Sequence, residues 1–209
     1  MKHKRIGVVK FLCVFSGWCF MLTAVAFGAE TENVKYSKFD KWEVSFEYPA
    51  QWKEHPADRV AMMKDYMAAE AKKENLELLE FSMITGENDR VALIITKIRR
   101  AENIEIPKLV AERNQVYKDA IAAGDVTKVN YVRETTAGGL PAVEEDVERS
   151  NGGRGHTIKV VSGKLILEAS FIAEKKEQFD PLCSGPVKHF VETVKLLSNK
   201  PKAVEGTTR

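Results

Sequence analysis

The sequence predicts an α+β fold in which helices cover both faces of a central, mostly antiparallel sheet of six to seven strands. Three observations lead to this prediction. Short segments alternate apolar and polar residues, as strands do, and glycine-rich connections join several of them, as in antiparallel hairpins. Residues 91–95 read Val-Ala-Leu-Ile-Ile and are apolar on both faces, which places them centrally in a sheet covered on both sides. Three longer segments carry apolar residues at helical spacing.

The first strand and the first helix follow a polar segment, residues 30–40, in which we expect no regular structure. Residues 42–48 alternate as Trp-Glu-Val-Ser-Phe-Glu-Tyr, so we expect a strand with one solvent-facing side, ended by Pro49. Residues 56–75 predict a helix, because Pro56 suits the first helical position and an apolar stripe follows it. The stripe consists of Val60, Met63, Met67 and Ala71, widened by Met62 and Tyr66.

A hairpin and a second helix come next. Residues 76–84 and 91–98 predict two strands, and the turn-forming residues 86–89, Gly-Glu-Asn-Asp, join them. The second helix begins at Pro107 and ends before Gly124, because glycine suits the position just after a helix. The apolar side of this helix consists of Val110, Val116, Tyr117, Ala120 and Ile121.

Four more strands and a final helix complete the predicted domain. The strands are residues 126–134, 141–149, 156–161 and 164–173, with turns at 138–139, 151–153 and 162–163. The final helix begins near Pro186 and carries Val187, Phe190, Val191, Val194 and Leu197 on one face. We find no internal repeat, so we expect residues 30–198 to form a single domain and residues 199–209 to be a disordered tail.

Residues 1–29 have the layout of a secretory signal peptide: a basic start, an apolar run and small residues at its end. Cleavage after Ala26, Gly28 or Ala29 fits the pattern. We therefore expect an exported, periplasmic or otherwise extracytoplasmic protein. The alternative is an uncleaved anchor, since the apolar run is near the lower limit for a membrane span, and it would be the only membrane contact. Neither Cys13 nor Cys19 follows a small residue, so we expect no lipoprotein.

Charge argues against a nucleic-acid-binding protein, and cysteine content argues against a protein stabilised by disulfides. The chain has 32 basic and 30 acidic side chains. Residues 1–29 contain four of the basic ones and no acid, which leaves 28 against 30, a net charge of −2. Nucleic-acid binding needs a basic surface, so we expect none. Cys183 is the one cysteine after residue 29, which rules out an intramolecular disulfide and favours a buried apolar role.

Two short motifs resemble the PsbP family and its bacterial relatives, the DcrB-like exported proteins. Residues 42–52, Trp-Glu-Val-Ser-Phe-Glu-Tyr-Pro-Ala-Gln-Trp, are similar to the opening strand of the family and its Tyr-Pro-x-x-Trp. Residues 138–142, Gly-Gly-Leu-Pro-Ala, are similar to its mid-chain turn. The resemblance covers residues 39–197 and implies an α/β/α sandwich around an antiparallel sheet. The family includes photosystem II extrinsic subunits and many exported bacterial proteins of unassigned role.

No functional residue is carried over from that family. Metal-binding histidines described for plant members have no counterpart, since His55, His156 and His189 lie in no matching motif. Glu144, Asp146 and Glu148 alternate along one strand, so they face the same side roughly 7 Å apart. Such carboxylates could bind Ca²⁺, but we expect them to pair with basic side chains of the neighbouring strands. The candidates for this pairing are Arg133, Arg154 and Lys159.

No catalytic signature is found, and we expect neither an enzyme nor a cofactor or metal. The sequence contains no Gly-x-Ser-x-Gly, His-Glu-x-x-His or Cys-x-x-Cys motif. Cys183 and His189 would lie about 240° apart on one helix, too far around it to act together. We expect Trp52 to pack in the core rather than stack on a ligand. The glycine-rich residues 151–155 lack the lysine of a phosphate loop and predict a hairpin tip.

The helix at 56–75 offers a candidate partner surface, formed by Met62, Met63, Tyr66 and Met67. Methionine adapts to irregular partners and is common at promiscuous binding surfaces. The alternative is that Met63 and Met67 pack on the sheet while Met62 lies at the rim. We therefore expect a non-enzymatic exported protein that binds another envelope protein or assists assembly there. The second hypothesis is a periplasmic module that binds a small molecule or metal ion, in a pocket between sheet and helix or at the carboxylates.

Overall fold

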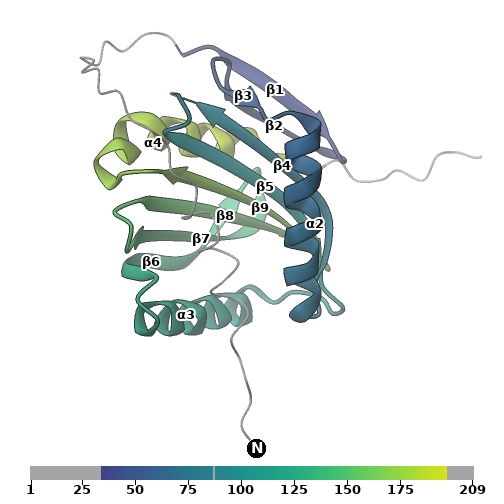
Figure 1. Cartoon of the computed structure of the whole chain (residues 1–209). Helices are drawn as coiled ribbons and strands as arrows, with labels where there is room; N and C mark the ends of the chain where they lie inside the picture. The colour runs from purple at the N-terminus through teal and green to yellow at the C-terminus, as the bar shows by residue number, and fades with distance from the viewer. Residues whose placement is uncertain (1–33, 87, 197–209) are drawn as a thin grey trace, which may run out of the picture.

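The computed structural model describes residues 34–86 and 88–196. The expected signal peptide, residues 1–29, and the expected tail, residues 199–209, lie outside this part of the chain. Within it, a seven-stranded antiparallel sheet forms the middle layer, with strand order β3-β4-β5-β9-β8-β7-β6 (Figure 1). The strands are β3 (Lys53–Glu54), β4 (Glu77–Gly86), β5 (Val91–Arg99), β6 (Val126–Ala137), β7 (Leu140–Arg149), β8 (Arg154–Ser162) and β9 (Leu165–Ala173). This sheet and the helices on both sides of it confirm the predicted α+β sandwich.

A small second sheet was not expected. It has the order β1-β2-β10, with β1 (Tyr36–Lys41), β2 (Val44–Pro49) and β10 (Lys195–Leu196). The prediction that residues 30–40 lack regular structure is therefore wrong for β1. Trp42 and Glu43, which we expected in a strand, instead form the turn between β1 and β2, with φ of 59° and 60°. This turn lets β1 place Phe39 on Phe46, with ring centroids 4.6 Å apart, and both side chains are buried.

Of the helices in the part of the chain that the structure describes, two lie on one face of the large sheet and the third lies on the other face (Figure 1). Helices α2 (Ala57–Lys73) and α3 (Ile106–Ala122) share the first face. Their ends agree with the prediction to within two residues, because Pro56 precedes α2, Pro107 lies in the first turn of α3, and Gly124 follows α3 with a φ of 78°. Among the described residues, no helix combines the length and the hydropathy that crossing a membrane requires.

Helix α4 (Lys176–Thr193) begins ten residues before the predicted start at Pro186 and contains both Pro181 and Pro186. Each internal proline removes a hydrogen bond and costs roughly 3 kcal/mol. The helix nevertheless forms because Phe179 and Cys183 extend the buried stripe of Val187 and Phe190 backwards by two turns. Burying side chains of this size contributes roughly 1.5–3 kcal/mol each, which offsets the proline penalty.

The two faces of the large sheet are packed differently. Under α4 and the small sheet, one continuous apolar cluster runs across the sheet and includes Trp52, Phe171, Phe179 and Phe190. Trp52 is buried and packs near Phe171, so its predicted core position is confirmed. Under α2 and α3 the apolar residues form three separate clusters. These are Met67, Phe81, Met83 and Ile94 under α2, then Leu109, Val143, Val161 and Ile166, and Tyr117, Ala120, Val126 and Val147 along α3.

Candidate functional site

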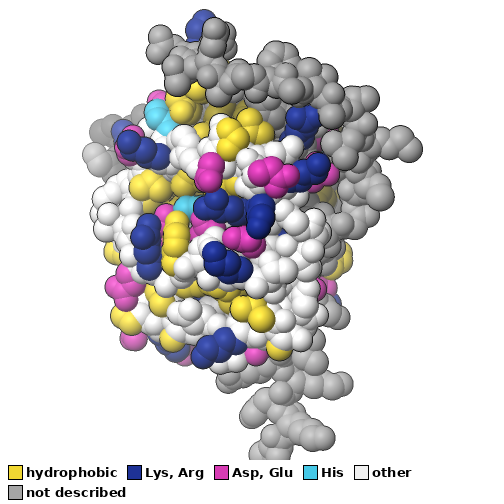
Figure 2. Space-filling model, turned by 90° about the vertical axis from the view of Figure 1, so that its left-hand side faces the viewer, with side chains coloured by type: hydrophobic (Ala, Val, Ile, Leu, Met, Phe, Trp, Pro, Cys, Tyr) yellow, Lys and Arg dark blue, Asp and Glu magenta, His cyan; other side chains and the backbone are white. Residues whose placement is uncertain are grey.

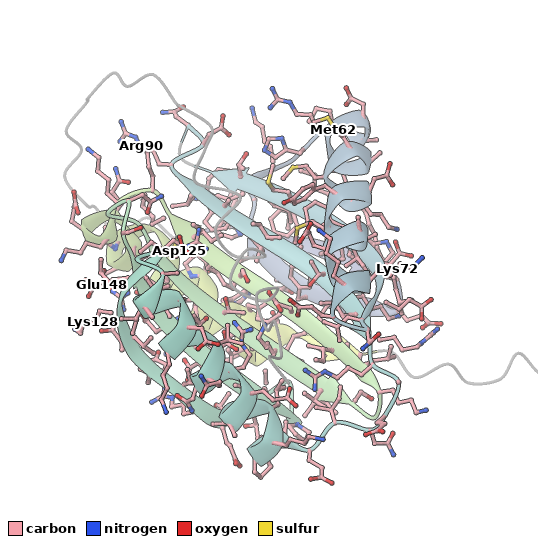
Figure 3. The ribbon with its side chains drawn as sticks, turned by 60° about the horizontal axis from the view of Figure 1, so that its bottom comes forward. Met62, Lys72, Arg90, Asp125, Lys128 and Glu148 are labelled. Carbon is pink, nitrogen blue, oxygen red and sulfur yellow. The ribbon has the colours of Figure 1, made fainter. Side chains whose placement is uncertain are left out.

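The four residues of the expected partner surface on α2 are divided between the surface and the core. Met62 is 59% exposed and Tyr66 is 43% exposed, one helical turn apart. Met67 is buried, and Met63 packs against the same apolar cluster on the sheet. Figure 3 shows Met62 beside the end of α2 that lies farther from Lys72. A partner that approaches α2 from solvent would therefore meet Met62 and Tyr66, not Met67.

The three carboxylates along β7 are paired with basic side chains. Arg133 lies 2.6 Å from Glu144, and Arg154 holds Asp146 with two hydrogen bonds of 3.1 and 2.8 Å. Glu148 lies 3.7 Å from Lys128, and Figure 3 shows these two residues beside each other. Figure 2 likewise shows acidic side chains next to Lys and Arg side chains on the face it presents. The expected pairing of these carboxylates is confirmed for Arg133 and Arg154, which hold Glu144 and Asp146.

Lys159 does not take part in this pairing, because its side chain lies on the opposite face of the sheet. Side chains alternate along a strand, so Lys159 on β8 faces the same side as Glu145 of β7, not Glu144 or Asp146. It pairs with Glu168 of β9. Among the described residues, no group of three or more His, Cys, Asp and Glu side chains is arranged to hold a metal ion.

His156 is the one histidine that joins two carboxylates in the described part of the chain. Its Nε2 lies 2.9 Å from Glu144, poorly aligned for a hydrogen bond, and its Nδ1 lies 3.4 Å from Asp146. The buried ring stacks on Phe179 of α4, with centroids 6.0 Å apart. Burial would raise the pKa of Asp146, but hydrogen bonds from His156, Arg154 and Asn130 hold it well below its usual range. The cluster thus ties β7 and β8 to α4.

Cys183 and His189 do not form a nucleophilic pair. Burial raises the pKa of the Cys183 thiol to about 12, so the group is a neutral, packed thiol near pH 7. His189 lies 2.7 Å from Glu47 and stacks on Tyr36, with centroids 3.6 Å apart, which fastens the small sheet to α4. The two side chains thus lie in different surroundings, as their spacing along the helix predicts.

Sequence reasoning missed a second polar cluster, on the side of the sheet that α2 and α3 cover. We call it the polar band; it consists of Thr96, Arg113, Tyr117, Glu145, Thr157, Lys159, Glu168 and Ser170. It runs across β5, β9, β8 and β7 between the cluster under α2 and those under α3. Figure 3 shows α2 and α3 on the same side of the sheet, with strands passing between them.

An ion pair forms the centre of the polar band. Arg113 of α3 donates two hydrogen bonds to Glu145, of 2.8 and 3.1 Å, and the Tyr117 hydroxyl donates a third, of 2.6 Å. Glu145 is 1% exposed. Burial alone would raise the pKa of Glu145, but the charges of Arg113 and Lys159 and these hydrogen bonds lower it. Burial beside Glu145 raises the pKa of Tyr117, so its hydroxyl remains a donor.

The rest of the polar band is linked through hydroxyl groups. Lys159 pairs with Glu168, which accepts a 3.3 Å hydrogen bond from Ser170. The hydroxyls of Ser170 and Thr157 are 2.9 Å apart. The Thr96 side chain is 2% exposed, and its Oγ1 has no hydrogen-bond partner in the described part of the chain.

One signal could have revealed the polar band. The strands β8 and β9 are joined by a two-residue turn, Gly163-Lys164, which sets their register. That register places Lys159 opposite Glu168 and Thr157 opposite Ser170. Counting outwards from the turn therefore brings these four polar side chains together on one face.

Comparison with known proteins finds similarity to solved structures only. No family model matches the chain, and no curated protein matches it. The solution structure of the cyanobacterial PsbP protein (CyanoP) from Synechocystis sp. PCC 6803 is 9% identical, with a TM-score of 0.49, over 82% of this chain and 98% of that one. A crystal structure from Bacteroides thetaiotaomicron is 11% identical, with a TM-score of 0.47, over 78% of this chain and 48% of that one. This chain thus spans about half the length of the Bacteroides protein.

Proposed function

We propose that this chain is an exported, non-enzymatic, PsbP-like protein that binds another protein of the cell envelope and acts there as an accessory or assembly factor. The observation that carries the proposal is the exposed pair Met62 and Tyr66 on α2. Four large hydrophobic side chains are exposed among the described residues, and these two lie one turn apart on the same helix. Methionine adapts to the shape of a partner, and tyrosine is enriched among residues that dominate binding energy.

The other parts of the proposal rest on the sequence. Residues 1–29, which lie outside the described residues, support export. The motifs at 42–52 and 138–142 support a relation to the PsbP and DcrB-like proteins. A non-enzymatic role is supported by the pairing of the candidate ionisable groups: Glu144 and Asp146 are held by arginines, and the Cys183 thiol is buried.

The test is crosslinked co-purification from the envelope of the source organism, read by mass spectrometry. Met62→Asp places a charge in the proposed interface and should abolish capture of one reproducible partner without lowering the melting temperature. Ile121→Asp is the matched control, because Ile121 is similarly exposed, at 47%, but lies on α3. Equal capture by both variants, or a loss that is explained by unfolding of Met62→Asp, would contradict the proposal.

A second candidate function, binding of a small molecule, is favoured by the polar band. The alternative of a metal-ion module has less support, because the carboxylates Glu144 and Asp146 already accept hydrogen bonds from arginines. Calorimetry with Ca²⁺, Mn²⁺ and Zn²⁺ distinguishes binding of a metal ion from binding of a small molecule. A heat of binding that Glu144→Gln abolishes would favour the metal-ion module. If none of the three ions gave a heat of binding, the metal-ion module would be excluded.

A further inference from the structure

Helix α2 carries a stripe of exposed residues on the side that is turned away from the sheet. We call it the outer stripe; it consists of Asp58, Met62, Tyr66, Ala69 and Lys73, all of them exposed. At roughly 100° per residue, the five positions fall within about 80° of one another around the helix. The residues that α2 buries, Met67 and Ala71, lie on the opposite side of the helix, which packs on β4.

The chemical character of the outer stripe changes along the helix. Its first residue, Asp58, is acidic, its last, Lys73, is basic, and the three residues between them carry no charge. Met62 and Tyr66 are large and hydrophobic, whereas Ala69 is small. The two end charges also suit the dipole of the helix. The dipole does not account for the hydrophobic side chains between them, since the solvent-facing side of a surface helix is normally polar.

The order of these residues makes the outer stripe complementary to itself in the antiparallel direction. Asp58 and Lys73 have the same midpoint along the helix as Met62 and Ala69, and Tyr66 lies beside that midpoint. If two copies of α2 pack antiparallel about it, Asp58 of each copy lies opposite Lys73 of the other. Met62 of each copy lies opposite the small Ala69 of the other, and the two Tyr66 rings meet at the centre.

We propose that the outer stripe is the contact surface of a weak homodimer, in which two copies of this chain pack their α2 helices antiparallel about a two-fold axis. Two-fold pairs that use the same surface on both copies are the commonest homodimers. A second copy matches the whole stripe at once, with opposite charges at both ends of the contact and hydrophobic side chains between them. Methionine sulfur also makes favourable contacts with aromatic rings, and Met62 would lie beside Tyr66 of the second copy.

Lys73 remains available for this contact although it also pairs with Glu70 of its own helix. That pair is formed at the surface, and the Lys73 side chain is 64% exposed. An exposed pair of this kind contributes little, so Lys73 can turn to Asp58 of a second copy at small cost. A single helix face is small compared with the surface that a stable complex buries, and we therefore expect a reversible dimer of low affinity.

The dimer covers Met62 and Tyr66, so a second copy and the envelope partner of the proposed function would compete for the same side chains. This competition rests on the proposed function, whereas the self-association does not. Sedimentation equilibrium of the purified exported protein, at concentrations up to about 1 mM, tests the self-association without any partner present. We expect a reversible equilibrium between monomer and dimer, which Met62→Asp abolishes.

Exchange of the two end charges tests the antiparallel geometry. Asp58→Lys and Lys73→Asp each replace two attractive contacts by two repulsive ones, so each should weaken dimerisation about tenfold. The double variant Asp58→Lys, Lys73→Asp restores both attractions and should dimerise as the unmodified protein does. Lys118→Asp is the matched control, because it changes the net charge as Lys73→Asp does but lies on an exposed position of α3, and it should leave dimerisation unchanged.

A mixture of the two single variants provides an independent check. In a mixed pair the two introduced charges meet at one end and two native charges meet at the other, and both contacts are attractive. The mixture should therefore dimerise more strongly than either variant alone. The melting temperature separates association from folding, because both substitutions oppose the helix dipole. It should fall further in the double variant, although dimerisation recovers there.

Three results would overturn the inference. The first is a protein that remains monomeric at about 1 mM. The second is dimerisation that recovers neither in the double variant nor in the mixture. The third is a loss in Lys118→Asp as large as that in Lys73→Asp, which would assign the effect to net charge. A dimer without a captured envelope partner would contradict the proposed function alone, and a captured partner with a monomeric protein would contradict this inference alone.

Discussion

Arg113 and Glu145 form a buried, two-bond ion pair that joins the middle of α3 to strand β7 of the sheet. Apolar contacts hold α3 at either end of this pair, at Leu109 on one side and Ala120 on the other. An apolar helix face alone would tolerate small rotations, since hydrophobic contact is not directional. A bidentate guanidinium–carboxylate contact has a fixed geometry, so the pair sets the rotation of α3 on the sheet.

Removing one partner of this ion pair should cost far more than removing both. Glu145→Ala leaves the Arg113 guanidinium buried without its counter-charge, and we expect a loss of roughly 3–5 kcal/mol in the free energy of unfolding. The double variant Arg113→Met, Glu145→Leu removes both charges and fills the space with apolar side chains. It should therefore be much closer to the unmodified protein than Glu145→Ala. Urea unfolding followed by circular dichroism measures the free energy of unfolding of both variants.

The pair of Arg133 and Glu144, in which the arginine is exposed, is the control for this prediction. Arg133 is mostly exposed, so Arg133→Ala should change the free energy of unfolding by less than roughly 1 kcal/mol. A loss in Arg133→Ala as large as that in Glu145→Ala would show that burial is not what makes the Arg113–Glu145 pair important.

Asp146 should make stability depend on acid pH. Its pKa in the folded protein is depressed, so the unfolded chain binds the proton more readily. The stabilising contribution is fully present above the unfolded pKa, about 4, and is lost as the pH falls through the lower folded value. Asp146→Asn should therefore lower stability at pH 7 and flatten its fall between about pH 4 and pH 2. Asp65→Asn, on the exposed side of α2, should leave the profile unchanged; a profile that Asp146→Asn also leaves unchanged would refute the assignment.

Local signals predicted the helices on the first face well, and they failed where structure depends on distant residues. Helix α2 begins after Pro56, and helix α3 begins beside Pro107 and ends before Gly124; the conformational preferences of proline and glycine are local. The strand β1 was missed because Trp42 and Glu43 form the turn that follows it, both at positive φ. Residues with such side chains rarely adopt this conformation, so the sequence contains no signal for the turn. The predicted start of helix α4 near Pro186 was too late, because burial of Phe179 and Cys183 carries the helix through Pro181 from Lys176.

The candidate sites, like the helices and strands, divide into those that local patterns predict and those that depend on distant residues. The pairing of Glu144 and Asp146 with arginines followed from strand alternation alone. The polar band did not, because no local pattern places Thr96, Glu145 and Lys159 beside one another. Only the register of four strands and the position of α3 bury them together, and those are tertiary features.

Cys183 should be unreactive in the folded protein. The thiolate is the form that attacks disulfide reagents, and burial raises the pKa of this thiol to about 12. In a chain that begins at residue 30, and so lacks Cys13 and Cys19, the reagent DTNB should react with no thiol in native buffer and with one in 6 M urea. Rapid reaction of the folded protein would mean that the segment of α4 around Cys183 opens readily.

Two glycines should respond in opposite ways to the addition of one methyl group. A Cβ on Gly86 would lie 2.2 Å from the Trp52 ring, which is itself packed in the core. Gly86→Ala must therefore displace the indole, and we expect a loss of roughly 1–3 kcal/mol in the free energy of unfolding. A Cβ on Gly185, within α4, would meet nothing within 4 Å outside its own helix backbone and its chain neighbours. Alanine favours a helix over glycine by roughly 1 kcal/mol, and the clash of a Cβ with the following Pro186 offsets only part of this gain. Gly185→Ala should thus raise the urea midpoint while Gly86→Ala lowers it. If Gly185→Ala were destabilising, the passage of α4 through Pro181 and Pro186 would need a glycine between the prolines, and the helix would not be regular there.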